Sequence, residues 1–214
     1  MENFFNLVKI LSEGLGTTLL IFILTLVLGI PVGILIAMAR NSKNKILSNI
    51  TKLYILIIRG TPMMLQIIFI YFAPYYLFKI NYDRFVAIII AFVVNYAAYF
   101  AEIYRGGIES ISAGQYEAAK ILGYSKAQTF FRIILPQVIK RILPSVTNEV
   151  ITLVKDTSLA FVVAVSEMFT IAKQIASAQT TMMPFVIAAV FYFVFNLLVA
   201  IVMDKIEKKL NYYR

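Results

Sequence analysis

The stretch TTLLIFILTLVLGIPVGILIAMA, residues 17–39, contains no charged residue. A helix needs roughly 20 apolar residues to cross about 30 Å of hydrocarbon, because it rises about 1.5 Å per residue. This stretch is long enough to cross, and so is a second uncharged run, residues 184–203. The sequence therefore predicts an all-α integral membrane protein in which these two runs are spans.

The composition of the whole chain agrees with a membrane protein. Its 214 residues are 61% hydrophobic and include no His, Cys or Trp. This length predicts a single transmembrane domain over residues 1–214. Because His and Cys are absent, the chain lacks the usual ligands of a zinc site, a histidine base and any disulfide. We expect neither a catalytic nor a metal site.

Three further spans are predicted at about 62–78, 85–104 and 143–172, which makes five. The span at 62–78 follows a break at residues 59–62, Arg-Gly-Thr-Pro. The span at 143–172 is apolar only in pieces, and hydropathy alone leaves it open. Its interruptions are four charged residues: Glu149, Lys155, Asp156 and Glu167.

The distribution of basic residues supports five spans, because short cytoplasmic loops of membrane proteins carry an excess of Lys and Arg. With the N-terminus outside and the C-terminus in the cytoplasm, the inner segments hold fourteen Lys and Arg and the outer segments hold four. Without the span at 143–172, the basic C-terminal cluster, Lys205 to Arg214, falls on the outer side. The net charge of +9 thus reflects membrane topology, and no nucleic-acid partner is expected.

The first residues, MENFFNLVKILSEG, place apolar side chains among polar ones. This pattern predicts a short helix lying along the membrane surface. The stretch is not a convincing cleavable signal, because its start is acidic and no small-residue cleavage site follows.

A polar island, EAAKILGYSKAQTFFRIILPQ at residues 117–137, lies in an inner loop of about 105–142. Its composition predicts two short helices. Gly123 is expected to end the first helix, Ser125 to cap the second and Pro136 to end it. Ile121 and Leu122 would face no hydrocarbon in such a loop, so they require either a protein partner or the lipid headgroups.

The island resembles the EAA loop of the membrane subunits of bacterial ABC importers. The likeness is carried by Glu117-Ala118-Ala119, by Gly123 four positions later, and by Ile133, Leu135 and Pro136. The stretches RGTPMMLQIIFIYF (59–72), AEIYRGGIESISAGQ (101–115), LPQVIKRILPSVTNEVI (135–151) and KDTSLA (155–160) are similar to the polar amino-acid uptake subfamily. The resemblance covers about residues 17–203.

This resemblance implies a permease of the bacterial cytoplasmic membrane that works by alternating access. It implies a coupling helix that docks on a dimer of cytoplasmic ATPase subunits, through Glu117, Ala118, Ala119, Leu122, Gly123 and Tyr124. A second membrane subunit, identical or paralogous, and an extracytoplasmic solute-binding protein complete the assembly. ATP and Mg²⁺ are expected on the ATPase, since this chain has no G-x-x-x-x-G-K-[ST] loop and no cofactor of its own.

Polar groups within the predicted spans are candidates for the solute pathway, because they are costly in hydrocarbon. Asn95, Tyr99 and Glu102 share one helix face by their spacing of four and seven residues. Glu102 would bind a cationic side chain or an ammonium group, which favours basic amino acids. The alternative is an acid at the membrane edge that pairs with Arg105.

Two breaks supply the other candidates. Lys155, Asp156, Thr157 and Ser158 predict a local helix break, which would offer a carboxylate-binding Lys and two hydroxyl donors; pairing of Lys155 or Asp156 with a neighbouring subunit is equally open. Thr61 and Pro62 predict the start of a helix aimed at the cavity, with Gln66 one turn inside. A kink at the membrane boundary, with Arg59 reaching the headgroups, is the alternative there.

Two other classes of membrane protein are alternatives to a permease: a gated channel and an assembly scaffold. A gated channel would need rings of pore-lining residues but no coupling helix, and a membrane assembly scaffold would need neither a polar cavity nor a broken fourth span. Neither explains the spacing of the EAA loop.

Overall fold

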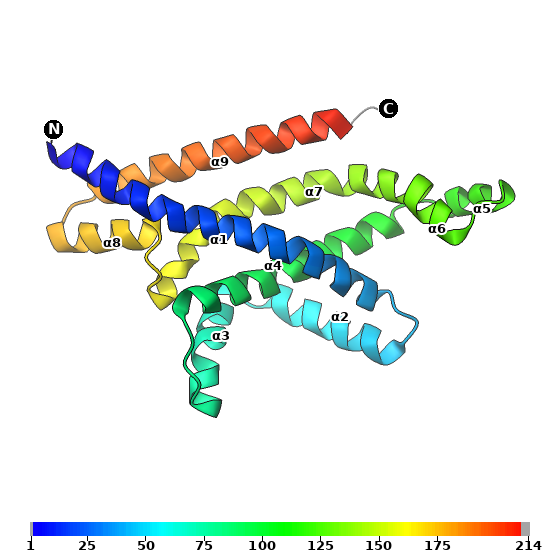
Figure 1. Cartoon of the computed structure of the whole chain (residues 1–214), viewed down its shortest axis with the longest axis horizontal. Helices are drawn as coiled ribbons and strands as arrows, with labels where there is room; N and C mark the ends of the chain where they lie inside the picture. Colours follow the sequence, from blue (N-terminus) through cyan, green and yellow to red (C-terminus); the bar gives the residue numbers. More distant parts are fainter. Residues whose placement is uncertain (1, 211–214) are drawn as a thin grey trace.

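The computed structural model describes residues 2–210, and every regular element in that range is helical (Figure 1). A π-helical turn, Thr129–Ile134, joins α6 to α7, and a 3₁₀ segment, Thr157–Val163, follows α7. The predicted all-α class is therefore confirmed. The α-helices are α1 (Glu2–Arg40), α2 (Lys45–Gly60), α3 (Met63–Phe78), α4 (Arg84–Glu109), α5 (Ala113–Ile121), α6 (Lys126–Gln128), α7 (Leu135–Asp156), α8 (Met168–Gln179) and α9 (Met183–Leu210).

Within these residues, three helices are long and apolar enough to cross a membrane alone: α1, α4 and α9. They contain the spans predicted at 17–39, 85–104 and 184–203. Two further candidates are bent pairs. Helices α2 and α3 meet at 112°, and the helical segment 126–163 meets α8 at 55°. The number of spans is three, or up to five if each bent pair is one span.

The span predicted at 62–78 corresponds to α3, which is too short to cross by itself. Helix α3 has 16 residues and is about 24 Å long, which is less than the hydrocarbon thickness. It is a candidate crossing only as part of the bent pair with α2. The break between them lies at Thr61 and Pro62, where Pro62 precedes α3 with extended backbone angles (φ −61°, ψ 132°).

The separate surface helix predicted at the N-terminus is also corrected. Helix α1 runs without interruption from Glu2 to Arg40, so these residues continue the first span. Leu7 and Leu11 are buried in a cluster with Met168 and Ala172 of α8 and Ile187 of α9. Their apolar face therefore packs on protein rather than on headgroups. Met1 and Arg214 lie outside the described residues.

Helix α4 forms the centre of the molecule. Its Phe92, Tyr96 and Phe100 are almost fully buried and recur every four residues, so they line one face that packs against α1 and α7. Helix α1 approaches this face through Gly33, where a Cβ atom would lie 2.8 Å from the Phe100 Cβ and 3.2 Å from the Ala97 carbonyl oxygen. The small residue sets the close α1–α4 contact.

Glu167 is one of the four charged residues that interrupt the predicted fourth span, and the structure gives it a capping role. Its fully buried carboxylate caps α8 and accepts hydrogen bonds from the backbone N–H groups of Phe169 (2.8 Å) and Thr170 (2.6 Å). The Tyr192 hydroxyl of α9 also donates to it, at 2.9 Å. A buried carboxylate with several donors satisfies its polar atoms, so Glu167 fixes the turn between α7 and α8 against α9.

Two glycines of α1 provide a matched test of how closely α1 packs against the start of α8. A Cβ at Gly14 would lie 2.8 Å from the Met168 Cα and 2.9 Å from the Met168 nitrogen, whereas one at Gly16 would meet no atom within 4 Å. We expect Gly14→Ala to destabilise the protein by about 1–3 kcal/mol, because a backbone atom cannot move aside cheaply. Gly16→Ala should be neutral or stabilising by up to about 1 kcal/mol, because Ala favours helix.

Thermal unfolding of the two purified variants in one detergent measures this difference. Equal melting temperatures for Gly14→Ala and Gly16→Ala would contradict the close contact between α1 and the start of α8.

Candidate functional site

Helix α7 has two unlike faces. Val146, Val150, Leu153 and Val154 belong to the core that contains Phe92 and Tyr96 of α4, or pack against it. On the opposite face, polar residues recur at intervals of four, three, four and three. They are all exposed except the half-buried Thr152, and we call them the polar stripe of α7: Arg141, Ser145, Asn148, Thr152 and Lys155.

Helix α9 shows what a lipid-facing surface of this chain looks like. Its exposed side chains are apolar for five turns. They are Val186, Val190, Phe193, Val194, Leu197, Leu198, Ile201 and Val202. Polar side chains at membrane depth face protein or water rather than acyl chains. The polar stripe of α7 is therefore unsuited to lipid.

Two carboxylates flank the polar stripe on the side of α4. The Tyr96 hydroxyl donates a hydrogen bond of 2.8 Å to Asp156 Oδ2. Glu149 lies two turns earlier on α7 and interacts electrostatically with Asp156 and with Arg59 of α2. Asp156 thus has a partner within the chain. The pairing with a neighbouring subunit that the sequence left open stays a prediction.

The break predicted at residues 155–158 is confirmed, because α7 ends at Asp156 and continues as a 3₁₀ segment. The four residues do not form one site. Thr157 is fully buried and its hydroxyl donates to the Val154 carbonyl at 2.7 Å. Lys155 and Ser158 instead line a cavity of about 300 Å³ with Phe169, Phe185, Ala188, Ala189 and Tyr192.

Three other predicted residues, the buried Gln66 and Asn95 and the exposed Thr61, form a polar network at the α2–α3 break. Gln66 Nε2 donates to Thr61 Oγ1 at 2.8 Å and to the Ile58 carbonyl at 2.8 Å. Asn95 Nδ2 of α4 donates to Gln66 Oε1, also at 2.8 Å. Gln66 and Asn95 are 8% and 5% exposed, so their amides hold the break against α4. Their contact with a solute stays a prediction.

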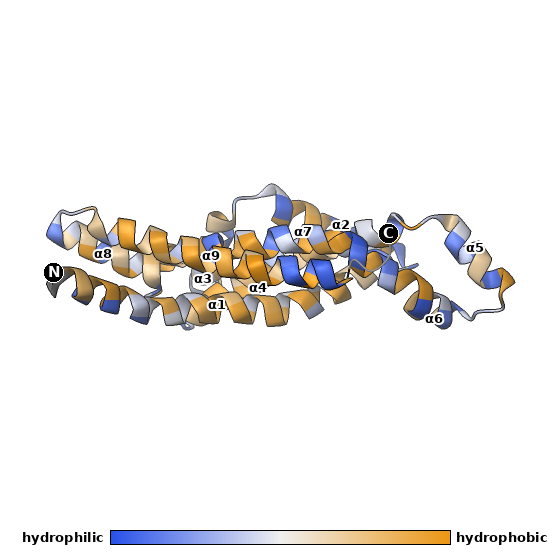
Figure 2. Ribbon diagram, turned by 90° about the horizontal axis from the view of Figure 1, so that it is seen from above, coloured by the Kyte–Doolittle hydropathy of each residue, from blue (hydrophilic) through white to orange (hydrophobic). Residues whose placement is uncertain are grey.

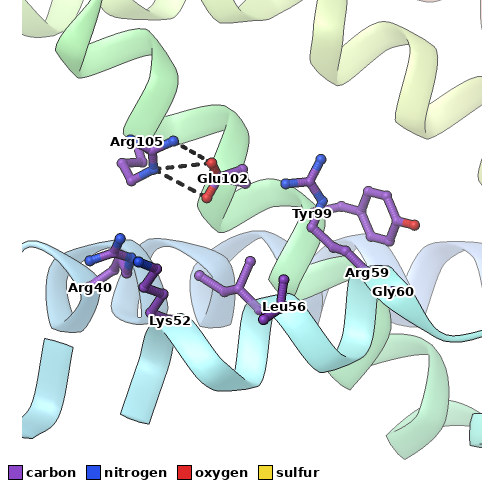
Figure 3. A pocket seen from close by; sticks show the side chains of 9 residues that line it. Arg40, Lys52, Leu56, Arg59, Gly60, Tyr99, Glu102 and Arg105 are labelled. Atoms are coloured by element: carbon purple, nitrogen blue, oxygen red, sulfur yellow. Dashed lines mark hydrogen bonds and ion pairs between the residues drawn. The ribbon is translucent and has the colours of Figure 1, made fainter. Parts of the chain in front are cut away.

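Tyr99 and Glu102 are predicted to share one face of a helix with Asn95. Both line a cavity (Figure 3). The Arg59 guanidinium lies over the Tyr99 ring, 5.3 Å from its centroid. Glu102 is paired with Arg105, whose Nε donates to both carboxylate oxygens at 3.1 and 3.2 Å. The pair matches the alternative that the spacing of these residues left open.

The segment with the EAA pattern stands apart from the other helices. Figures 1 and 2 show α5 and α6 at one end of the molecule, opposite α8. Gly123 ends α5 with a φ of +77°, a conformation that favours glycine, and Ser125 caps α6 with a capping box. These two sequence predictions are confirmed.

The prediction that Pro136 ends the second helix is wrong. The helix continues from Lys126 to Asp156 through the π-helical turn Thr129–Ile134. A π-helical turn widens the backbone ahead of the proline, which lacks an N–H and would otherwise clash with the carbonyl four residues earlier. The segment is therefore one short helix, α5, beside the long helical arm that leads into α7.

Helix α5 presents a mixed surface. Glu117 and Ala118 are exposed, while Ala119 is buried. The apolar side chains that follow are among the most exposed of the described residues, with Ile121 at 86% and Leu122 at 72%; Tyr124 is 37% exposed. Such a surface is typical of a short helix that inserts into a groove of another protein.

Sequence reasoning missed the central part of the polar stripe: Ser145, Asn148 and Thr152. The available signal was a four-three recurrence of polar residues within an otherwise apolar segment, which marks one face of a helix.

Among the described residues, the fold thus combines helices apolar enough to cross a membrane with a polar face on α7 and a projecting short helix, α5. Residues 29–212 match the family model described as a binding-protein-dependent transport system inner membrane component. The chain belongs to this family.

Curated relatives agree along nearly the whole chain. The glutamine transport system permease protein GlnP of Escherichia coli strain K12 is 35% identical over 95% of this chain and 94% of its own length. The L-cystine transport system permease protein TcyB of Bacillus subtilis strain 168 is 36% identical, over 95% of this chain and 88% of its own. The arginine transport system permease protein ArtQ of the same strain is 33% identical, over 95% and 94%.

Solved structures show the same fold. A crystal structure of an amino acid ABC transporter with histidines superposes with a TM-score of 0.87 at 33% identity, covering 94% of each chain. The inward-facing MetNI methionine ABC transporter superposes with a TM-score of 0.73 at 20% identity, covering 96% of each chain. The second likeness concerns the fold alone.

The amide network at the α2–α3 break yields a test of its structural role. Asn95→Leu removes one partner and leaves the buried Gln66 Oε1 without a donor, which costs about 1–3 kcal/mol. Gln66→Leu alone also removes the bonds to the Ile58 carbonyl and to Thr61. The double variant Asn95→Leu with Gln66→Leu should therefore be destabilised by less than the sum of the two single variants, because the Asn95–Gln66 bond is lost only once.

Melting temperatures of the wild type, both single variants and the double variant measure the coupling. A double variant as unstable as the sum of the single variants would contradict direct pairing of Asn95 with Gln66.

Proposed function

We propose that this chain is the transmembrane subunit of an ATP-binding-cassette importer for polar amino acids. The polar stripe of α7 carries the proposal, because a crossing helix with such a face needs a water-filled pathway or a second protein beside it. The family match and the relatives named as amino-acid permeases support it. The membrane is the bacterial cytoplasmic membrane, with the N-terminus outside and the C-terminus in the cytoplasm.

In this proposal, two membrane subunits pair with their α7 helices facing a shared pathway. Ser145, Asn148 and Thr152 offer hydrogen bonds along the crossing. Lys155 and Ser158 lie at the bend, where the α-helix gives way to the 3₁₀ segment. Bent helices at membrane depth are a recurrent way to present backbone and side chains to a transported solute.

The energy for transport comes from a separate dimer of ATPase subunits, which bind ATP and Mg²⁺. Helix α5 docks in a groove of that subunit through Leu122, Tyr124 and the exposed part of the Glu-Ala-Ala sequence. The helical arm from Lys126 to Asp156 then connects the docking helix directly to the polar stripe. A rigid-body movement of α5 thus reaches the pathway, as alternating access requires. A solute-binding protein delivers the amino acid from the opposite end.

The charges favour recognition of the amino-acid backbone. Lys155 is exposed in its cavity and suits the α-carboxylate, a group that glutamine, cystine and arginine share. Glu102, which suggested a preference for basic amino acids, already binds Arg105. Its role as a side-chain selector stays a prediction.

A channel or an assembly scaffold accounts for less. A channel leaves the exposed apolar end of α5 without a purpose, and a scaffold leaves the polar stripe of α7 without one. Only a pump that couples an external motor to a crossing pathway uses both surfaces.

Docking of α5 is tested by Leu122→Glu, which places a charge on a side chain that is 72% exposed. Because most of this side chain is exposed, we expect folding to be unaffected. ATPase co-purification and uptake of labelled amino acids in proteoliposomes with the binding protein should fall at least about tenfold, the loss expected when a charge enters an apolar contact.

The matched control is Ile80→Glu, in the connection between α3 and α4, where the side chain is 56% exposed. It should retain ATPase association. Retention of both association and uptake by Leu122→Glu would overturn the assignment of α5.

A further inference from the structure

The cavity that contains Tyr99 and Glu102 is strongly basic (Figure 3). It has a volume of about 510 Å³ and lies between the end of α1, one face of α2 and the last turns of α4. Its charged side chains are Arg40, Lys52, Arg59, Glu102 and Arg105. Four cations thus share the cavity with one carboxylate.

That carboxylate does not balance the cavity. Glu102 already forms an ion pair with Arg105, which also pairs with Glu109. Among residues 2–210, Arg40, Lys52 and Arg59 form no ion pair within 4 Å. Like charges in one cavity repel one another unless an anion lies between them. The cavity therefore has an excess of three positive charges that favours an anionic ligand.

An aliphatic surface adjoins these cations on α2. Ile46, Ile50, Leu53 and Ile57 recur at intervals of four, three and four and are 72%, 62%, 56% and 52% exposed. Lys52 and Arg59 lie on the neighbouring face, and Leu56 lies between the two rows and lines the cavity. Helix α2 thus carries a basic row and an aliphatic row side by side.

The position of the cavity suits the edge of a membrane. Arg40 ends α1 and Arg105 lies in the last turns of α4, and both helices are long enough to cross. Lys52 and Arg59 are seven residues apart, or about 10 Å along α2. Long basic side chains at such a boundary reach the level of lipid phosphates.

We infer that this cavity binds the headgroup of an anionic phospholipid, whose phosphate lies among Arg40, Lys52 and Arg59 while its acyl chains cover the aliphatic row of α2. A soluble anion would use the cations but leave the aliphatic row uncovered. A second copy of this chain would bring the same cations against these ones across a twofold axis, which is unfavourable. A phospholipid supplies a phosphate for the basic row and acyl chains for the aliphatic row.

The test uses the full-length chain in nanodiscs of phosphatidylcholine with or without phosphatidylglycerol. Lys52→Gln with Arg59→Gln removes two cavity cations. The control, Lys43→Gln with Lys45→Gln, removes two exposed cations from the α1–α2 connection and the start of α2, outside the cavity. Native mass spectrometry counts retained phosphatidylglycerol, and thermal unfolding reports stabilisation.

We expect the wild type and the control to retain phosphatidylglycerol and melt at a higher temperature with it. The cavity variant should bind at least roughly tenfold less and lose the shift, since each cation near a lipid phosphate contributes appreciably. Equal loss in the control would show a general surface effect and overturn the inference. Stabilisation by inorganic phosphate in pure phosphatidylcholine would assign the cavity to a soluble anion, and dimerisation that removes the lipid from it would assign it to a second copy; either result overturns it as well.

Discussion

A helix that crosses a membrane cannot turn polar side chains toward acyl chains without a large cost, and this constraint organises the whole molecule. Helices α1 and α9 satisfy it with exposed apolar surfaces. Helix α7 satisfies it only halfway, because its valines and leucine pack on α4 while its opposite face is polar. If α7 crosses the membrane as proposed, water or another protein surface is expected to cover that face.

The same constraint explains how buried polar groups are used elsewhere. Where the chain breaks a helix, a side chain takes over the lost backbone bonds: Gln66 binds the Ile58 carbonyl at the α2–α3 break, and Glu167 caps α8 after the 3₁₀ segment. These groups build stiff corners. In the proposed mechanism, such corners would help to transmit a displacement of α5 along the α7 arm.

Sequence reasoning located the helical membrane class, three of the crossing helices, the glycine corner at Gly123 and the break after Asp156, because each has a local signal. It misjudged features that depend on distant contacts. Leu7 and Leu11 fit a surface helix by sequence, but in the structure α8 and α9 cover them. Pro136 is expected to end a helix, but the π-helical turn before it lets the helix continue. The hydrogen bond from Asn95 to Gln66 could not be inferred from spacing either, because the two residues lie 29 positions apart; a pathway role for Asn95 stays a prediction.

In the proposed importer, the polar stripe of α7 lines an aqueous pathway. Because the chain contains no cysteine, single Cys substitutions at positions 145, 148 and 152 can be probed with a hydrophilic thiol reagent in the assembled, membrane-embedded complex. Positions 190 and 194, on the exposed apolar face of α9, are the comparison. The account predicts labelling at all three α7 positions, slowed by a transported amino acid, and none on α9. Labelling of α9 with protection of α7 from the reagent would contradict it.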